Sequence, residues 1–183
     1  MRIISGSLKG RKFPAPKGLG IRPTSDKVKG SIFNILGIKV EGAVVLDLFA
    51  GCGTLGIEAL SRGAHFCWFV ESDRLRAAEL KKNLVNLNLE GVSEVLSLDF
   101  ARGLRYLINK GLKFNIIFAD PPYEKGFVAR IFSDLNIKLL TYEDSSLVIE
   151  RSKREPLPDI SPFELYNEKV FGDTYISFLK VIS

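Results

Sequence analysis

The sequence has few of the residues that build disulfide frameworks and metal centres. Its 183 residues include two cysteines, Cys52 and Cys67, and one histidine, His65. Two cysteines are too few for a disulfide framework or a cysteine-based zinc cluster, and the histidine stands in a predicted turn. We therefore expect no metal site and no histidine-based catalytic triad.

The sequence also lacks a long hydrophobic run. No apolar stretch approaches the length that a transmembrane helix needs, and residues 1–6 lack the apolar core of a signal peptide. Hydrophobic residues make up 46% of the chain and charged residues 26%, which is ordinary for one globular domain of this length. We expect a cytoplasmic monomer with no membrane partner.

Positive charge is concentrated at the N-terminus. The net charge is +5, but residues 1–40 hold nine basic side chains and a single acidic one, so the rest of the chain is mildly acidic. A basic segment of this kind favours a polyanionic partner, because each lysine or arginine on a phosphate releases a counterion. The sequence predicts a basic, nucleic-acid-facing extension over residues 1–40 and a second unit over 41–183. A solvated tail is the alternative.

The order of apolar runs predicts an α/β fold. Within the extension we expect a hairpin over residues 2–17 and a helix over 25–36, and from residue 43 strands and helices alternate. Strands are predicted over 43–49, 66–71, 93–97, 114–119 and 145–151, and helices over 53–62, 74–87, 99–109 and 125–138. Two final runs, 163–171 and 175–182, predict an antiparallel hairpin. The pattern indicates a Rossmann-like, doubly wound, mostly parallel seven-stranded sheet.

A glycine-rich loop follows the first strand of this sheet. Gly51, Gly53 and Gly56 satisfy the G-x-G-x-x-G spacing of dinucleotide sites, and Glu71 closes the next strand about 20 residues later. Asp47, near the end of the first strand, would repel a pyrophosphate and attract a cation. S-adenosylmethionine (SAM) is such a ligand, because its ammonium and sulfonium are positive and its ribose diol suits an acid at Glu71. The alternatives are a loop-bracing Asp47 and a solvated Glu71.

Acidic residues recur at the carboxyl ends of the strands, where ligands of open α/β sheets bind. Asp99 could accept a hydrogen bond from an adenine amine, with Phe100 as an apolar wall, or could simply cap the helix that follows. Asp120-Pro121-Pro122-Tyr123 ends the fourth predicted strand. The two prolines remove both N–H donors, so the turn offers acceptors to a planar amino group. Tyr123 could stack on the base that carries this group. The alternative is a rigid turn with a capping aspartate.

The sequence resembles the RsmD-type methyltransferases of bacteria over nearly its whole length. The segments that carry the resemblance are Arg2–Gly6 with Gly10-Arg11, Arg22–Lys29, Ile32–Leu36, Asp47–Gly53, Leu55–Ala64, Val70–Asp73, Asp120–Tyr123 and Gly172–Thr174. The Arg-Pro-Thr segment and the basic extension narrow the match to this family, because the glycine loop and the Asp-Pro-Pro-Tyr turn are shared by many amino-methyltransferases.

The resemblance implies transfer of a methyl group from SAM to the exocyclic N2 of a guanine in small-subunit (16S) ribosomal RNA, naked or in an assembling subunit. The implied cofactor-binding residues are Asp47, Gly51, Gly53, Glu71, Asp99 and Phe100. The implied catalytic residues are Asp120, Pro121 and Tyr123, and the implied RNA-facing residues are Arg2, Lys9, Arg11, Lys12 and Arg22.

Three other readings of the sequence stay open. One is an enzyme that methylates adenine N6 or another base amine in DNA or a different RNA. The second is an NAD-dependent oxidoreductase, which the glycine spacing permits. The third is a nucleic-acid-binding module without catalysis, against which the intact Asp-Pro-Pro-Tyr turn argues.

Overall fold

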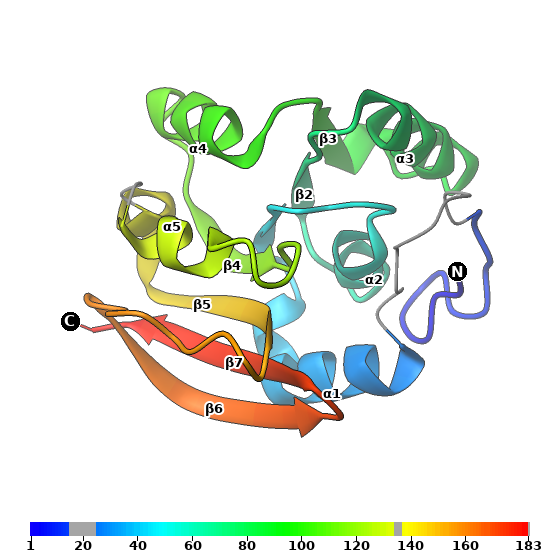
Figure 1. Ribbon diagram of the computed structural model, residues 1–183. Coiled ribbons are helices and arrows are strands. Elements are labelled where there is room, and N and C mark those ends of the chain that lie inside the picture. The colour runs from blue at the N-terminus through cyan, green and yellow to red at the C-terminus, as the bar shows by residue number, and fades with distance from the viewer. Residues whose placement is uncertain (15–24, 134–136, 183) are drawn as a thin grey trace.

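A single seven-stranded sheet forms the centre of the molecule (Figure 1). The computed structural model describes residues 1–14, 25–133 and 137–182. The strands are β1 (Val44–Asp47), β2 (Phe66–Val70), β3 (Ser93–Leu96), β4 (Phe114–Ala119), β5 (Thr141–Ser152), β6 (Phe163–Phe171) and β7 (Thr174–Val181). They are ordered β3-β2-β1-β4-β5-β7-β6; β1 to β5 are parallel, and β7 runs antiparallel to both its neighbours. The predicted sheet and its C-terminal hairpin are thus confirmed.

Helices cover both faces of the sheet. They are α1 (Asp26–Leu36), α2 (Thr54–Ser61), α3 (Arg74–Asn86), α4 (Phe100–Asn109) and α5 (Phe127–Ser133), with 3-10 turns at Gly37–Val40, Glu90–Val92 and Ile137–Leu140. Alternate residues of β4 enter two different cores. Ile116 and Phe118 pack in the core that contains residues of α1, α2 and α3, whereas Ile117 and Ala119 pack in the core with α4 and α5. A strand buried on both faces reads as a nearly continuous apolar run, as β4 does from Ile116 to Ala119.

Two elements differ from the prediction by four or more residues at one end, and the others by no more than two. The helix expected over 125–138 begins at Phe127, because Gly126 has a φ of +70°, which is a left-handed and non-helical conformation. Residues 137–140 form a 3-10 turn and do not continue the helix. The strand expected over 145–151 already begins at Thr141, which pairs with Phe114 ahead of a register shift in β4. The polar residues at the start of β5 hid this extension.

The N-terminal extension packs on the sheet domain. Met1 and Phe13 exchange two hydrogen bonds, the Ile3 N–H donates to the Arg11 carbonyl, and the Ile3 carbonyl accepts from the Gly10 N–H. The expected hairpin is therefore present as a short, irregular ladder. The expected helix is α1, and Ser25 is its N-cap, because the Ser25 hydroxyl accepts a hydrogen bond from the Val28 N–H. Ile3 and Phe13 are buried in the same core as α1, α2 and α3. Residues 1–14 and α1 therefore share their hydrophobic core with the rest of the described chain.

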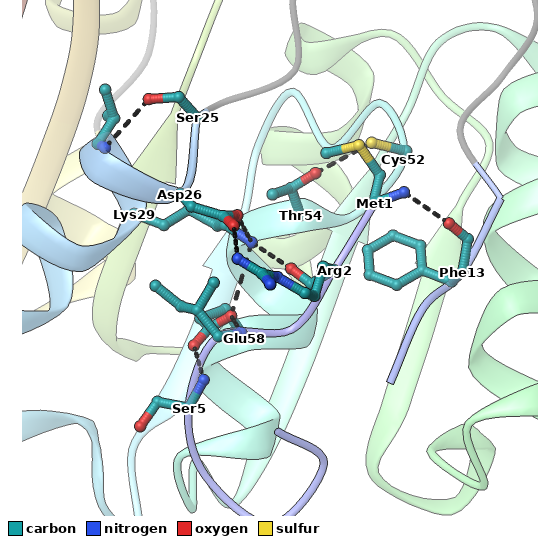
Figure 2. Close-up of polar contacts among 12 residues, drawn as sticks. Met1, Arg2, Ser5, Phe13, Ser25, Asp26, Lys29, Cys52, Thr54 and Glu58 are labelled. Carbon is teal, nitrogen blue, oxygen red and sulfur yellow. Dashed lines mark hydrogen bonds and ion pairs between the residues drawn. The ribbon is translucent and has the colours of Figure 1, made fainter. Parts of the chain in front are cut away.

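A buried ion cluster fixes this extension to α2 (Figure 2). Lys29, only 1% exposed, donates to the Arg2 carbonyl and lies 3.8 Å from the Glu58 carboxylate. Glu58 also accepts hydrogen bonds from the backbone N–H groups of Ile4 and Ser5. Because a buried charge is costly unless it is paired, the cluster ties α1 and residues 1–5 to the helix that follows the glycine loop.

Within the described ranges, no helix is long and apolar enough to span a membrane.

Candidate active site

A cleft of about 640 Å³ lies at the carboxyl ends of the parallel strands. This volume suits a small-molecule ligand. Most of the predicted site residues line it, namely Asp47, Gly51, Glu71, Asp99, Phe100, Asp120, Pro121 and Tyr123. Residues that are separated by more than 70 positions in the chain thus meet in one site, as expected for residues at the carboxyl ends of neighbouring parallel strands.

Asp47 ends β1 at the base of the cleft and is 3% exposed. Its carboxylate accepts a hydrogen bond from the Gly56 N–H at 3.0 Å, so it braces the first turn of α2. Burial raises the pKa of the Asp47 carboxyl to about 7, the Gly56 bond opposes this rise, and the negative charge of Glu71 adds to it. A cationic ligand in the cleft would offset the cost of ionising this group.

The glycines of the loop serve two different purposes. Gly51 lines the cleft with a φ of +54°, and its N–H donates to Glu71 at 2.7 Å. Gly53, also left-handed, does not line the cleft; a Cβ there would lie 2.5 Å from a methyl group of Leu80. A Cβ at Gly56 would lie 2.2 Å from the Phe69 ring. The glycine spacing therefore reflects close packing of α2 as much as ligand access, and Gly53 acts on the cleft only through the loop backbone.

Glu71 follows β2 and is 6% exposed. One carboxylate oxygen accepts from the Gly51 N–H, and the other accepts from the Asp73 N–H at 2.8 Å. The Ser72 hydroxyl lies 3.5 Å from the oxygen that Asp73 contacts, so that oxygen has two donors. The oxygen that accepts from Gly51 keeps a lone pair for a further hydrogen bond, because each carboxylate oxygen has two acceptor sites. Glu71 therefore fixes the glycine loop against β2 and also lines the cleft.

Asp99 and Phe100 border the cleft at the start of α4. The Asp99 carboxylate accepts from the Arg102 N–H at 3.0 Å as the N-cap of α4, and Asp99 also lines the cleft, so both predicted roles are compatible. The Phe100 ring stacks on Phe49 with centroids 5.4 Å apart and meets Phe127 edge to face. These three rings form an apolar wall of the cleft.

Asp120 follows β4 at the next strand end. Burial and the negative charges of Glu150 and Asp47 raise the pKa of the Asp120 carboxyl well above its usual range. Pro121 and Pro122 continue the cleft wall without N–H donors. This corner of the site is therefore rich in hydrogen-bond acceptors, and its carboxylate readily takes up a proton.

Tyr123 places an aromatic ring next to this corner. The ring lines the cleft, and the residue is 37% exposed. Its hydroxyl donates to the Glu150 carboxylate at 2.5 Å and lies 3.1 Å from the Thr174 hydroxyl. Burial and the bond to Glu150 raise the pKa of the Tyr123 phenol, so the side chain stays neutral at physiological pH. The face of a neutral ring remains available for stacking.

The sequence reasoning missed several residues of the cleft. Glu150 lies in β5 directly after Ile149, which pairs with Ala119, so the strand-end argument could have found it. Thr174 reaches Tyr123 only because the C-terminal hairpin docks on β5, which no local signal predicts. Arg76 and Lys125 add two basic side chains to the lining.

The predicted RNA-facing residues do not behave alike. Arg2 pairs with Asp26 at 2.6 Å, and Arg11 donates to the carbonyls of Asn86 and Leu87 at the end of α3. Lys9 and Lys12 are exposed on the N-terminal hairpin. Arg22 lies outside the described residues. Of the five candidates, Arg2 thus pairs within the extension, Arg11 links the extension to α3, and Lys9 and Lys12 extend into solvent.

Comparison with known proteins gives the family. The family described as "Conserved hypothetical protein 95" matches residues 1–180. The chain belongs to this RsmD-type family. It is 38% identical over 181 residues to "Putative rRNA methyltransferase YlbH" of Bacillus subtilis, with 98% of each chain covered. It is 36% identical over 173 residues to "Ribosomal RNA small subunit methyltransferase D" of Escherichia coli K12, covering 94% of this chain and 85% of that protein.

Solved structures agree with the fold assignment. The structure titled "Putative methyltransferase yhhF from Escherichia coli" superimposes with a TM-score of 0.87 at 34% identity, covering 99% of this chain and 97% of that one. The seven-stranded sheet of this family member is therefore a Rossmann-like methyltransferase fold.

Proposed function

We propose that this chain transfers a methyl group from SAM to the exocyclic N2 of a guanine in small-subunit ribosomal RNA. The observation that carries the proposal is the position of Asp120 and Tyr123, an acceptor-rich corner beside an aromatic ring, in the same cleft as Asp47 and Glu71. A base amine and a cationic cofactor would meet between these two pairs. Membership of the RsmD-type family supports small-subunit ribosomal RNA as the substrate. The choice of guanine rests on what the sequence resemblance to the RsmD-type methyltransferases implies.

The residues of the cleft suit the charge and shape of SAM. Asp47 is a buried carboxyl that a positive ligand charge would stabilise in its ionised form. Glu71 would accept hydrogen bonds from the ribose hydroxyls, and Asp99 from the adenine amine. Phe100, stacked on Phe49, would cover the adenine. When bound, SAM supplies a methyl group on a positively charged sulfur.

The chain's own residues would orient the base and remove a proton. The nitrogen of an exocyclic amine is a poor nucleophile, because its lone pair is delocalised into the ring. Asp120 and the carbonyl of the Pro121-Pro122 turn would accept its two hydrogens and turn the lone pair toward the methyl group. The amine gains a methyl group and must lose one proton, and the raised pKa of Asp120 suits it to receive that proton. Orientation of the base and electrostatic stabilisation of the transition state would supply the remaining rate enhancement.

The basic extension would contact the RNA backbone. Lys9 and Lys12 are exposed on a hairpin that is fixed to α2 by the buried cluster around Lys29. Phosphate contacts supply affinity and position but little sequence information. The choice of base would therefore come from the cleft.

Methyl transfer followed by nucleoside analysis tests the proposal. Labelled SAM is offered with naked small-subunit RNA, with assembled unmethylated subunits and with DNA. We expect N2-methylguanosine from the RNA or the subunits and no transfer to DNA. Detection of N6-methyladenosine would identify adenine, and not guanine, as the target base. No transfer to any of the three would contradict the proposal, and tighter binding of NAD than of SAM would favour an oxidoreductase.

A further inference from the structure

The hydroxyl of Tyr123 is held from two directions by residues far away in sequence. Glu150 in β5 accepts its hydrogen, and the Thr174 hydroxyl lies on its other side. At 2.5 Å the bond to Glu150 has the length of a charge-assisted O–H···O⁻ bond, which is about twice as strong as a neutral one. The ring itself still lines the cleft. The side chain is therefore fixed at its tip while the ring remains accessible.

The sheet explains how these two residues reach the tip. β5 and β7 are antiparallel neighbours, and Thr174 pairs with Ser152. Glu150 lies two residues before Ser152 and so shares its face of the strand. Both Glu150 and Thr174 thus belong to the sheet framework, and Thr174 is only 7% exposed. A ring on a loop is thereby attached to two rigid strands.

We infer that Glu150 and Thr174 are positioning residues that hold the Tyr123 ring as the stacking platform for the target base beside Asp120. This inference rests on the proposed function, because it takes the base as the ligand of the ring. Tyr123 has two main side-chain torsions, and a bond at its hydroxyl restricts both. If the ring moved freely, the base stacked on it could shift and its amine could leave hydrogen-bonding distance of Asp120. Small displacements of a reacting group lower the reaction rate strongly.

The C-terminal hairpin is then part of the active site. Thr174 is the first residue of β7, directly after the Gly172-Asp173 turn that joins it to β6. Gly172 has a φ of +59°, a conformation that suits glycine at a tight turn. The turn thus places Thr174 at the cleft. The hairpin does more than cover the edge of the sheet.

A double-mutant cycle tests the inference through kinetics. The variants are Thr174→Val, Thr174→Ser, Tyr123→Phe and the double variant Tyr123→Phe/Thr174→Val. We expect Thr174→Val to lower kcat about tenfold with less than a twofold change in the KM for RNA, because most of the RNA affinity comes from phosphate contacts. Thr174→Ser keeps the hydroxyl and should restore most of the rate. In the Tyr123→Phe background, Thr174→Val should have no further effect.

A second double-mutant cycle, with Glu150→Gln and Tyr123→Phe, tests the role of Glu150. Glu150→Gln replaces a charged acceptor by a neutral one, and its loss of kcat should be at least threefold smaller in the Tyr123→Phe background. Thr141→Val is the matched control, because Thr141 is buried and its hydroxyl donates to the Lys138 carbonyl away from the cleft. Additive losses in either cycle, or a change in KM alone, would overturn the inference.

A measurement without substrate separates this inference from the proposed function. Ring dynamics are followed by NMR on tyrosine-labelled protein, with Tyr123→Phe assigning the signal. We expect the Tyr123 ring to be rigid in the wild type, more mobile in Thr174→Val and Glu150→Gln, and unchanged in Thr141→Val. Equal mobility in all variants would contradict the positioning role. A rigid wild-type ring in a protein that methylates no RNA would leave the positioning of the ring standing and refute the proposed function.

Discussion

Replacing Asp47 with asparagine should make the ligand-free protein more stable above neutral pH. Burial shifts the pKa of Asp47 from 3.8 to about 7, which is about 3 units and so about 4 kcal/mol of unfavourable free energy once the group is ionised. Asparagine carries no charge and can keep the bond from the Gly56 N–H, but its amide hydrogens need partners, at a cost of about 1–3 kcal/mol. We expect a net gain of about 2 kcal/mol at pH 8.

The sign of the pH dependence follows from the raised pKa. Below about pH 4 the wild-type aspartate is protonated in both the folded and unfolded states, so it carries no penalty. As pH rises toward 7 the unfolded state ionises first, and the wild type loses stability that Asp47→Asn retains. Above about pH 7 the difference is constant.

Thermal unfolding between pH 4 and pH 9 measures this difference. About 2 kcal/mol corresponds to a rise in Tm of about 4–8 °C in a chain of this size. Near pH 4 the wild-type aspartate carries little penalty while the asparagine amide still lacks partners, so the difference should reverse there and leave the variant about 2 kcal/mol less stable than the wild type. Asp144→Asn makes the same chemical change at an exposed position and should alter stability by less than about 0.5 kcal/mol. A variant that is less stable than the wild type at pH 8, or equally stabilised at pH 4, would refute the reasoning.

Two further predictions concern the extension. Lys29→Met should lower the free energy of unfolding by about 2 kcal/mol, because it removes one of the two cations beside the buried Glu58 and the donor to the Arg2 carbonyl, while Arg62 stays 2.9 Å from Glu58. Lys27→Met on the exposed face of α1 should cost little. Thermal unfolding of both variants measures the difference, and equal costs would contradict a structural role for the cluster. Lys9→Gln with Lys12→Gln should weaken RNA binding and reduce its salt slope by about 0.7–0.9 for each lost phosphate contact. Lys138→Gln with Lys169→Gln is the matched charge control, because both lysines are exposed elsewhere on the molecule. An unchanged salt slope in the Lys9→Gln/Lys12→Gln variant would support the alternative that the extension is a solvated tail.

Most of the cleft could be predicted from the positions of acidic residues at strand ends. Asp47, Glu71, Asp99 and Asp120 each lie at or near the end of a predicted parallel strand, and the structure brings all four to one cleft. Their convergence could be predicted because parallel strands of one sheet share an edge. What each carboxylate does there depends on neighbours that the order of elements does not reveal. The brace from Asp47 to Gly56 is one such contact.

The roles of individual glycines and basic residues depend on tertiary contacts, which the sequence does not show. The spacing of Gly53 and Gly56 looked like a ligand loop, but both positions are also required by contacts with Leu80 and Phe69 on other elements. A count of positive charges could not show that the guanidinium of Arg11 binds the end of α3, whereas the side chain of Lys9 extends from the hairpin into solvent. Such distinctions appear only when distant segments are in place.

The central claim is that Asp120 acts on the base amine and not on the cofactor, and the Asp120→Ala variant tests it most directly. SAM affinity is measured by calorimetry and methyl transfer to small-subunit RNA is measured on the same preparation. We expect SAM binding within a few-fold of the wild type and a loss of transfer of at least about 100-fold, as for other removed transition-state contacts. Transfer within tenfold of the wild type would contradict the role that we assign to Asp120.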